Sequence, residues 1–427
     1  MSTNVADPPV PIPEPGLTPD EMLSRARDLR PWLRDEQDAT EQLGYYSQEL
    51  HGEFEKAGFY RCLQPRRFGG YEFDVKTFYR MAMELARGCP STGWCVCLGS
   101  GHALMMGAYF PEEAQAEAFG PDGEFLAPSV AAPMGTATPV DGGWLINGTW
   151  GYCSGAPYAS HFMPALLIPG EDPDHPRNGF AVVPRSQWTM LDDWGAILGL
   201  RGSGSNSIVV ENAVVPAYFV APMNMVDIDV SGGTFGVRLH GNPMYAGRLG
   251  GFFHGELVSL MVGTGRAALD EYEEIIRAKN TLFPPFVPRY SHHDYHRSLG
   301  LALGMLDAAE AICIRAAETY MECCRRGVED GQPFGLEDDL RTLASCEHAG
   351  RLVWEAVELL FRTSSSAAAK DGQRMQRYYR DLSIYRGHLS AQYDTIAQVL
   401  ARVHLGLQST LGPRVPPDFM KGEPQNG

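Results

Sequence analysis

The sequence is poor in positive charge. It has 35 lysine and arginine residues against 52 aspartate and glutamate residues, and the 427-residue chain carries a formal net charge of −17. A surface with this balance repels a phosphate backbone, so we expect no nucleic-acid partner. The same balance favours a partner protein with a basic docking face.

Long apolar runs and a nicotinamide-binding motif are also missing. No segment approaches the roughly 18 consecutive apolar residues of a membrane-spanning helix, so we expect no membrane partner. The segment Arg201–Ser207 departs from the Gly-x-Gly-x-x-Gly pattern of dinucleotide-binding folds at the third glycine. Since no nicotinamide domain is expected, electrons would be exchanged with a separate protein.

The cysteines form no recognisable framework. Their number is nine, which is odd, and neither their pairing nor their spacing indicates a disulfide set or a zinc site. This usage predicts a cytoplasmic protein without a metal. The group His292, His293, Asp294 and His296 follows several prolines and has no obvious further ligand, so it is interpreted as a solvated helix start.

Turn residues divide the chain into three zones. Helical patterns fill residues 18–122, short β-prone runs between turn signals fill residues 123–236, and helical patterns return over residues 237–412. Residues 1–17, rich in proline and without the features of a signal peptide, predict a disordered lead-in, and residues 413–427 predict a loose tail. The fold class is therefore α+β.

Particular signals place elements within these zones. Thr18, followed by proline and then Glu21, predicts a capped helix start. Ser91–Tyr109 is apolar on most faces and predicts one buried helix. Asp141–Gly143 and Asn147–Gly148 predict two consecutive hairpins in a β-sandwich or barrel.

Four long helices are expected in the third zone, and they would pack as a four-helix bundle. Their expected ranges are 249–276, Ser298–Arg326, Leu336–Thr363 and Met375–Leu407.

Five sequence fragments appear in an order that resembles the acyl-CoA dehydrogenase superfamily. They are Ala57–Phe59, Gln64–Gly70, Gly148–Gly155, Gly199–Ser205 after Trp194, and Val214–Pro216. The resemblance covers about residues 18–407. It implies an N-terminal helical domain, a central β-sandwich or barrel that binds flavin, and a C-terminal four-helix bundle.

Two details are similar to one branch, the two-component flavin-dependent monooxygenases that hydroxylate phenols, such as the oxygenase component of 4-hydroxyphenylacetate 3-hydroxylase. These are the segment Ser91–Trp94 and the version of the flavin strand that runs from Trp150 to Ser154. In the dehydrogenases a carboxylate base follows an Arg-Asp pair. Here Arg380-Asp381 is followed by no carboxylate before Asp394, and His388 stands in its place.

The resemblance implies a C4a-hydroperoxyflavin, formed from O₂ and reduced FMN or FAD that a separate NAD(P)H:flavin reductase supplies. Such a species needs a dry site with a proton donor, and a phenolic substrate must lose a proton. Histidine suits both tasks because its pKa lies near neutral pH. His388 is the first candidate, with Asp381 expected on the same helical face, and His102 is the second, with Trp94 as a wall of the substrate pocket.

Further residues are implied as flavin contacts. Ser129 would lie near flavin N5 and also act in catalysis, Ser154 and Trp150 would hold the ring, Arg266 would approach the isoalloxazine and Arg248 the phosphate. Purely structural roles are the alternative for each: a turn hydroxyl for a serine, a packed core side chain for a histidine or tryptophan, and a salt bridge for an arginine.

Several alternatives stay open. An acyl-CoA dehydrogenase could use Glu256 as its base, from a second position known in the superfamily. An oxygenase of the same fold could attack nitrogen or sulfur, and a scaffold could have lost flavin. The long apolar helix faces suggest a homotetramer by resemblance.

Overall fold

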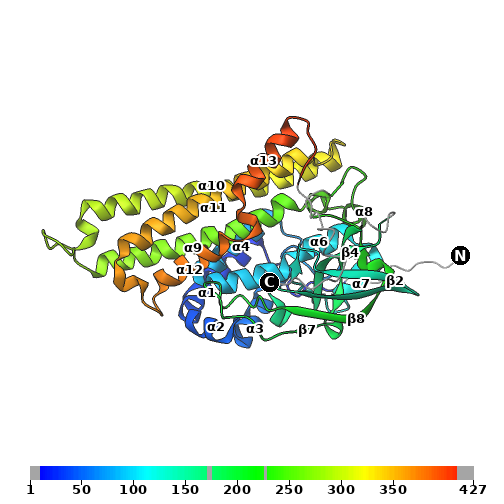
Figure 1. The fold of residues 1–427 in the computed structure, drawn as a ribbon, viewed down its shortest axis with the longest axis horizontal. Coiled ribbons are helices and arrows are strands. Elements are labelled where there is room, and N and C mark those ends of the chain that lie inside the picture. The colour runs from blue at the N-terminus through cyan, green and yellow to red at the C-terminus, as the bar shows by residue number, and fades with distance from the viewer. Residues whose placement is uncertain (1–9, 171–175, 226–227, 411–427) are drawn as a thin grey trace, which may run out of the picture.

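The structure is a computed structural model that describes residues 10–170, 176–225 and 228–410. The chain runs through helices, then strands, then helices again. Figure 1 shows long helices at one end of the molecule and the strands at the other. The boundaries expected at 122/123 and 236/237 remain a prediction, while the expected tail and residues 1–9 of the expected lead-in lie outside the described residues.

Local capping sets the start of the first helix. The Glu21 N–H donates to Thr18 Oγ1 (3.3 Å) and the Thr18 N–H donates to Glu21 Oε2 (2.9 Å), which is the expected capping box. The helices of this part are α1 (Pro19–Asp35), α2 (Gln37–Leu43), α3 (Gln48–Ala57), α4 (Val75–Gly88), α5 (Pro90–Ser100), α6 (His102–Tyr109) and α7 (Glu112–Phe119).

The stretch before α1 is ordered from Val10 onward, so the expectation of a lead-in disordered throughout is wrong. The Val10 N–H donates to Arg67 O (2.9 Å), Val10 forms a parallel bridge with Phe68, and Leu17 is buried. These partners are distant in sequence, which is why composition alone did not indicate them.

The apolar segment Ser91–Tyr109 is two helices rather than the one expected. They meet at Gly101, where an i→i+3 bond from Leu104 N to Gly101 O (3.1 Å) tightens the backbone. A Cβ at Gly101 would lie only 2.6 Å from Oε1 of Glu256, so any larger residue here would have to displace that buried carboxyl.

The strands form one connected mixed sheet in the order β7-β8-β3-β2-β4-β5-β9, with β1 and β6 paired to β4. The strands are β1 (Ser129–Val130), β2 (Gly135–Val140), β3 (Gly143–Trp150), β4 (His161–Ile168), β5 (Arg177–Ala181), β6 (Val183–Pro184), β7 (Thr189–Met190), β8 (Ile208–Pro216) and β9 (Val220–Ala221). Two of the pairs, β1–β4 and β2–β4, are parallel.

The first expected hairpin is present and the second is wrong. Val140 pairs with Gly143 across the Asp141–Gly142 turn. Asn147–Gly148 instead lies inside β3, where the register with β8 shifts between Ile146 and Gly148. Asn147 Oδ1 accepts the Asn212 N–H (2.7 Å), so the asparagine serves a bulge.

Three of the four expected bundle helices are continuous. They are α9 (Gly250–Ala278), α10 (His293–Glu329) and α11 (Leu336–Ser364), which lie side by side in Figure 1. A short helix, α8 (Phe235–His240), precedes them. Most of α9 is buried because it packs against α4, α10, α11 and α12.

The fourth expected helix is wrong, because the chain leaves the helix between α12 (Arg374–Tyr385) and α13 (Tyr393–His404). His388 lies in this connection with extended backbone and caps a short 3₁₀ turn, Leu389–Ala391. Asp381 therefore does not share a helical face with His388. Its Oδ1 accepts the Leu200 N–H (2.6 Å) instead.

All nine cysteines are buried and free. Within the described part of the chain, no helix is both long enough and apolar enough to cross a membrane.

Candidate active site

Trp94 of α5 joins the sheet to the bundle. Its indole Nε1–H donates to Ser154 Oγ (2.9 Å), just beyond the end of β3, and its ring lies edge-on to the His388 ring at 5.6 Å. Trp94 and Ser154 are both buried. Three residues that the sequence predicted for one site, from three separate parts of the chain, are thus brought together.

The Ser154 hydroxyl belongs to a buried chain of hydroxyls. Its Oγ lies 2.7 Å from Ser205 Oγ, which in turn lies 2.7 Å from Ser203 Oγ. Hydroxyl groups can donate or accept, so this chain can adapt to a polar ligand beside it. Sequence reasoning used Gly199–Ser205 only to identify the fold and missed Ser203 and Ser205 as site residues. The alternation of glycine and serine was the available signal.

His388 presents a hydrogen-bond donor. Its Nδ1 accepts the backbone N–H of Ser390 (3.1 Å), so in the neutral ring the proton resides on Nε2. Burial lowers the pKa of His388 to about 4, which keeps the ring neutral at physiological pH. The side chain can therefore donate from Nε2 without carrying a charge.

His102, at the start of α6, has the opposite tautomer. Its Nδ1–H donates to Leu98 O (2.9 Å), which leaves Nε2 with a lone pair. Burial lowers the pKa of His102 to about 4, although the carbonyls of Leu98 and Ala127 act in the other direction. The ring lies 5.0 Å from that of Phe253 on α9. His102 is thus an acceptor in an apolar setting.

Ser129 lies on the segment that leads into the sheet. The Ala127 N–H donates to Gly99 O (2.8 Å), which holds this segment against α5. Ser129 Oγ–H donates to Met163 O (2.6 Å), so its oxygen keeps acceptor capacity only. Its expected contact with flavin N5 remains a prediction.

Trp150 is a core side chain of the sheet. It is fully buried, and its Nε1–H donates to Ala165 O (2.8 Å) on β4. A Cβ on either Gly135 or Gly148 would collide with its ring, so these two glycines make room for it. A flavin contact at Trp150 would involve its backbone rather than its indole.

The two predicted arginines both form ion pairs. Arg266 pairs with Asp307 (2.8 Å) and Glu310 (2.6 Å) on α10. Arg248 is buried with its Nε 3.7 Å from Asp339 Oδ2. Flavin contacts by either arginine remain predictions.

An aromatic pair that sequence reasoning missed joins the exposed Tyr152, two residues before Ser154, to the half-buried Trp194. Tyr152 has a left-handed backbone (φ 62°), a conformation that is uncommon for a residue with a side chain. Its ring is 70% exposed and lies 5.6 Å from the ring of Trp194. Strain of this kind is typical of binding sites, and the tyrosine between two glycine-containing turns was the signal for it.

Glu256, the alternative base, is completely buried on α9. Neither of its carboxyl oxygens has a hydrogen-bond partner among the described residues, and burial raises its pKa well above the ordinary value. A carboxyl in this state holds its proton, which is unfavourable for a base.

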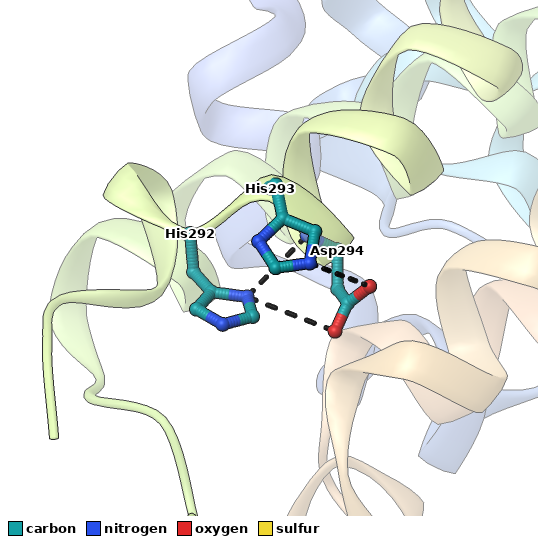
Figure 2. A group of neighbouring side chains, drawn as sticks. All are labelled: His292, His293 and Asp294. Atoms are coloured by element: carbon teal, nitrogen blue, oxygen red, sulfur yellow. Dashed lines mark hydrogen bonds and ion pairs between the residues drawn. The ribbon is translucent and has the colours of Figure 1, made fainter. Parts of the chain in front are cut away.

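His292, His293 and Asp294 cluster at the start of α10 (Figure 2). His292 Nδ1 accepts the Asp294 N–H (3.3 Å), and the Asp294 carboxylate lies 3.8 Å from His292 Nδ1 and 3.7 Å from His293 Nε2. His296 is turned away, with its Nε2 2.6 Å from Tyr290 O. His292 therefore caps the start of α10, and the interpretation of the group as a solvated helix start without a metal remains a prediction.

Comparison with known protein families gives two matches. Residues 26–122 match the N-terminal domain of acyl-CoA dehydrogenase, and residues 257–393 match its C-terminal domain. In sequence, one matched segment precedes the strands and the other follows them.

Individual relatives are similar over most of the chain. The flavin-dependent monooxygenase oxygenase subunit HsaA of Rhodococcus jostii is 28% identical over 86% of this chain and 93% of its own length. The p-hydroxyphenylacetate 3-hydroxylase oxygenase component of Acinetobacter baumannii is 25% identical over 92% and 91%. The crystal structure of the HsaA monooxygenase from Mycobacterium tuberculosis matches with a TM-score of 0.82 and 25% identity, over 92% of this chain and 99% of that one.

Proposed function

Since the chain belongs to the acyl-CoA dehydrogenase family, as its sequence fragments indicated, we propose that it is the oxygenase component of a two-component flavin-dependent monooxygenase. It would take reduced FMN or FAD from a separate NAD(P)H:flavin reductase and use O₂ to hydroxylate a phenol or another electron-rich aromatic ring. The relatives named above are flavin-dependent oxygenase components, and one of them acts on a phenol.

The junction at Trp94 carries this proposal. Ser154, at the end of the expected flavin strand, and His388, at the position of the dehydrogenase base, lie on two sides of one indole ring. A dehydrogenase needs a carboxylate that is ionised and faces the acyl chain. This junction offers a neutral imidazole instead, which suits proton donation to an oxygen atom.

The residues fit a flavin in their chemistry. The isoalloxazine is flat and amphipathic, with polar atoms along one edge. The hydroxyls of Ser154 and Ser205 could serve that edge, and the exposed Tyr152 ring, beside the half-buried Trp194, offers flat apolar surface. When bound, reduced flavin activates O₂, so that one of the two oxygen atoms of O₂ can be transferred to the aromatic ring.

The two histidines would have different hydrogen-bond roles, one as an acceptor and one as a donor. His102 Nε2 carries a lone pair and could accept a hydrogen bond from a phenolic hydroxyl, which makes the aromatic ring a better nucleophile. Its pKa of about 4, rather than the near-neutral value expected, makes it a hydrogen-bond acceptor and not a strong base. His388 Nε2–H could donate a hydrogen bond to the oxygen being transferred. His102, Phe253 and Trp94 are buried, and together with the partly buried His388 they would keep water away.

The alternatives are less well supported. Glu256 is the remaining candidate for a dehydrogenase base, and its burial keeps it protonated. An oxygenase that attacks nitrogen or sulfur would need no acceptor for a phenolic proton, so the lone pair on His102 favours a phenol. A homotetramer remains part of the proposal by resemblance, since it could bring an arginine such as Arg266 to a neighbouring flavin.

The test is isotope incorporation. The protein is mixed with a generic flavin reductase, NADH, FMN or FAD, a panel of phenols and ¹⁸O₂, and the products are analysed by mass spectrometry. One ¹⁸O atom per product supports the proposal, and parallel reactions with amines and sulfides test the other oxygenases. Reduction of bound FAD by an acyl-CoA, with no ¹⁸O in any product, would overturn it.

A further inference from the structure

A pair of buried ionisable groups lies close enough to His388 for the charge of His388 to act on it. His254 of α9 and Glu347 of α11 have side chains that are 8% and 1% exposed, and His254 Nε2 lies 3.6 Å from Glu347 Oε1. Neither of these two atoms has another hydrogen-bond partner within the described part of the chain. The proposed chemistry uses neither residue so far.

The tautomer of His254 determines which group carries the proton between them. Its Nδ1–H donates to Gly250 O (2.9 Å), because a carbonyl can only accept. Nε2 of the neutral ring is therefore an acceptor. The facing carboxyl completes a hydrogen bond only if it is protonated, so the two side chains are matched to share one proton.

Both members of the pair are connected to His388. The backbone N–H of Gln392 donates to the Glu347 carboxyl, and the Gln392 side-chain amide donates to His388 O (3.2 Å). A charge on His388 lowers the pKa of His254, so the two rings are close enough to influence each other. A change of charge on either residue would therefore change the electrostatic potential at His388.

We propose that His254 and Glu347 are positioning residues that hold one shared proton behind His388 and set the electrostatic environment in which His388 acts. This inference rests on the proposed hydroxylase function. The step within the pair is simple and balanced: the O–H bond of Glu347 breaks, an N–H bond forms at His254 Nε2, and the neutral pair becomes a carboxylate and an imidazolium. No other reactant is needed.

The pKa shifts agree with the geometry. Burial raises the pKa of Glu347 to about 8, against a weaker opposite effect of the Gln392 N–H, and burial lowers the pKa of His254 to about 4. The carboxyl is therefore protonated and the ring neutral at physiological pH. Loss of the shared proton as the pH rises through about 8 would place a negative charge behind His388.

Two groups whose pKa responds to a charge on Glu347 are neutral in this range, and Asp339 of α11, which acts on one of them, ionises earlier because its pKa is about 6. Tyr385 of α12 and Cys346 of α11 face Glu347, and Cys313 of α10 faces Tyr385 and Cys346. Burial raises the pKa of each of these three groups above its usual value. A charge that appears behind His388 near pH 8 would therefore come from Glu347.

The experiment is a pH titration of the full-length, flavin-free protein with ¹³C-labelled histidine, followed by NMR. The His388 signal, assigned with His388→Gln, should show an inflection near pH 8 in the wild type and none in Glu347→Gln, whose amide still donates to His254. Glu355→Gln is the matched control, because Glu355 lies on α11 as well but is exposed and pairs with Arg351 (3.1 Å). It should keep the inflection.

The same variants are then compared in hydroxylation. In the wild type and in Glu355→Gln, kcat should change with pH around 8, and Glu347→Gln should lose this dependence with little change in KM. If Glu347→Gln fails to fold, His254→Gln should move the His388 inflection instead. A His388 titration that is identical in wild type and Glu347→Gln overturns the inference even if the protein is a hydroxylase. An inflection that depends on Glu347 in a protein without hydroxylase activity would refute the proposed function alone.

Discussion

Replacing Trp94 with phenylalanine tests the junction on which the site depends. The substitution keeps an aromatic ring but removes the Nε1–H that donates to Ser154 Oγ (2.9 Å). A neutral buried hydrogen bond contributes about 1 kcal/mol net, which corresponds to about fivefold in an equilibrium constant. Ser154 keeps its bond to Ser205, so the loss should stay in this range rather than reach the cost of a fully unpaired hydroxyl.

Trp188→Phe is the matched control. Trp188 is buried like Trp94, but its Nε1 has no hydrogen-bond partner among the residues described. Both variants lose the same volume of indole, so the cost of the cavity is similar in the two. Trp188 also lies under the Arg185 guanidinium (4.1 Å to the ring centroid), so the two variants are compared in flavin binding rather than in stability. The difference in the free energy of flavin binding should be about 1 kcal/mol.

Two measurements check this prediction. Anaerobic titration should show reduced flavin binding about fivefold more weakly to Trp94→Phe than to Trp188→Phe, because the Ser154 hydroxyl keeps only its bond to Ser205 and is less firmly oriented. The yield of hydroxylated product per NADH consumed should also fall in Trp94→Phe, since the smaller phenyl ring packs less closely against His388. Equal flavin affinity and equal product yield in the two variants would refute the reasoning.

Further predictions concern His388, Glu256, His102 and Gly101. His388→Gln should lower product formation by about 10²–10⁴-fold, the usual contribution of a positioned proton donor or acceptor, while anaerobic binding of reduced flavin is kept; an unchanged rate would exclude His388 from the chemistry. Glu256→Gln should leave hydroxylation within about twofold of the wild type, because the carboxyl is already protonated, and a large loss would point to an ionised base. The pKa of His102 is about 4 in the folded protein against about 6.5 when unfolded, so the unfolded chain takes up this proton first as the pH falls. His102→Gln should therefore reduce the loss of stability between pH 7 and 5 by roughly 2 kcal/mol relative to the wild type, measured by denaturant titration at both pH values. An identical loss in the two proteins would refute the assignment of a neutral ring. Gly101→Ala should destabilise the protein by about 1–3 kcal/mol in thermal unfolding, because its Cβ would collide with Glu256, and a double variant with Glu256→Ala should recover part of that loss.

Sequence patterns were sufficient where neighbouring residues decide the structure. The Thr18 capping box and the Asp141–Gly142 turn formed as expected, because both depend on contacts within a few residues. The Asn147–Gly148 turn failed for the opposite reason. Pairing of β3 with β8 continued through it, and the asparagine bonded to Asn212 across the sheet instead of closing a hairpin.

The candidate site residues came from the resemblance, and their roles remain predictions. Comparison with the family's base position singled out His388, and the same resemblance supplied Trp94, Ser154 and His102. The helical geometry expected for His388 with Asp381 was wrong, since Ser390 and Leu200 are their respective partners. Arg266 likewise has carboxylate partners on α10 that no local pattern indicated.

The sequence by itself determined the family, the order of the three zones and the exchange of a carboxylate for His388, because each of these is written in a local pattern or motif. The tertiary structure alone decided the tautomers of His102 and His388, the indole junction at Trp94, and the His254–Glu347 pair. The physical reason is that a proton's position depends on which carbonyl, amide or carboxyl lies opposite. Those groups come from helices and turns far apart in the chain, and packing brings them together.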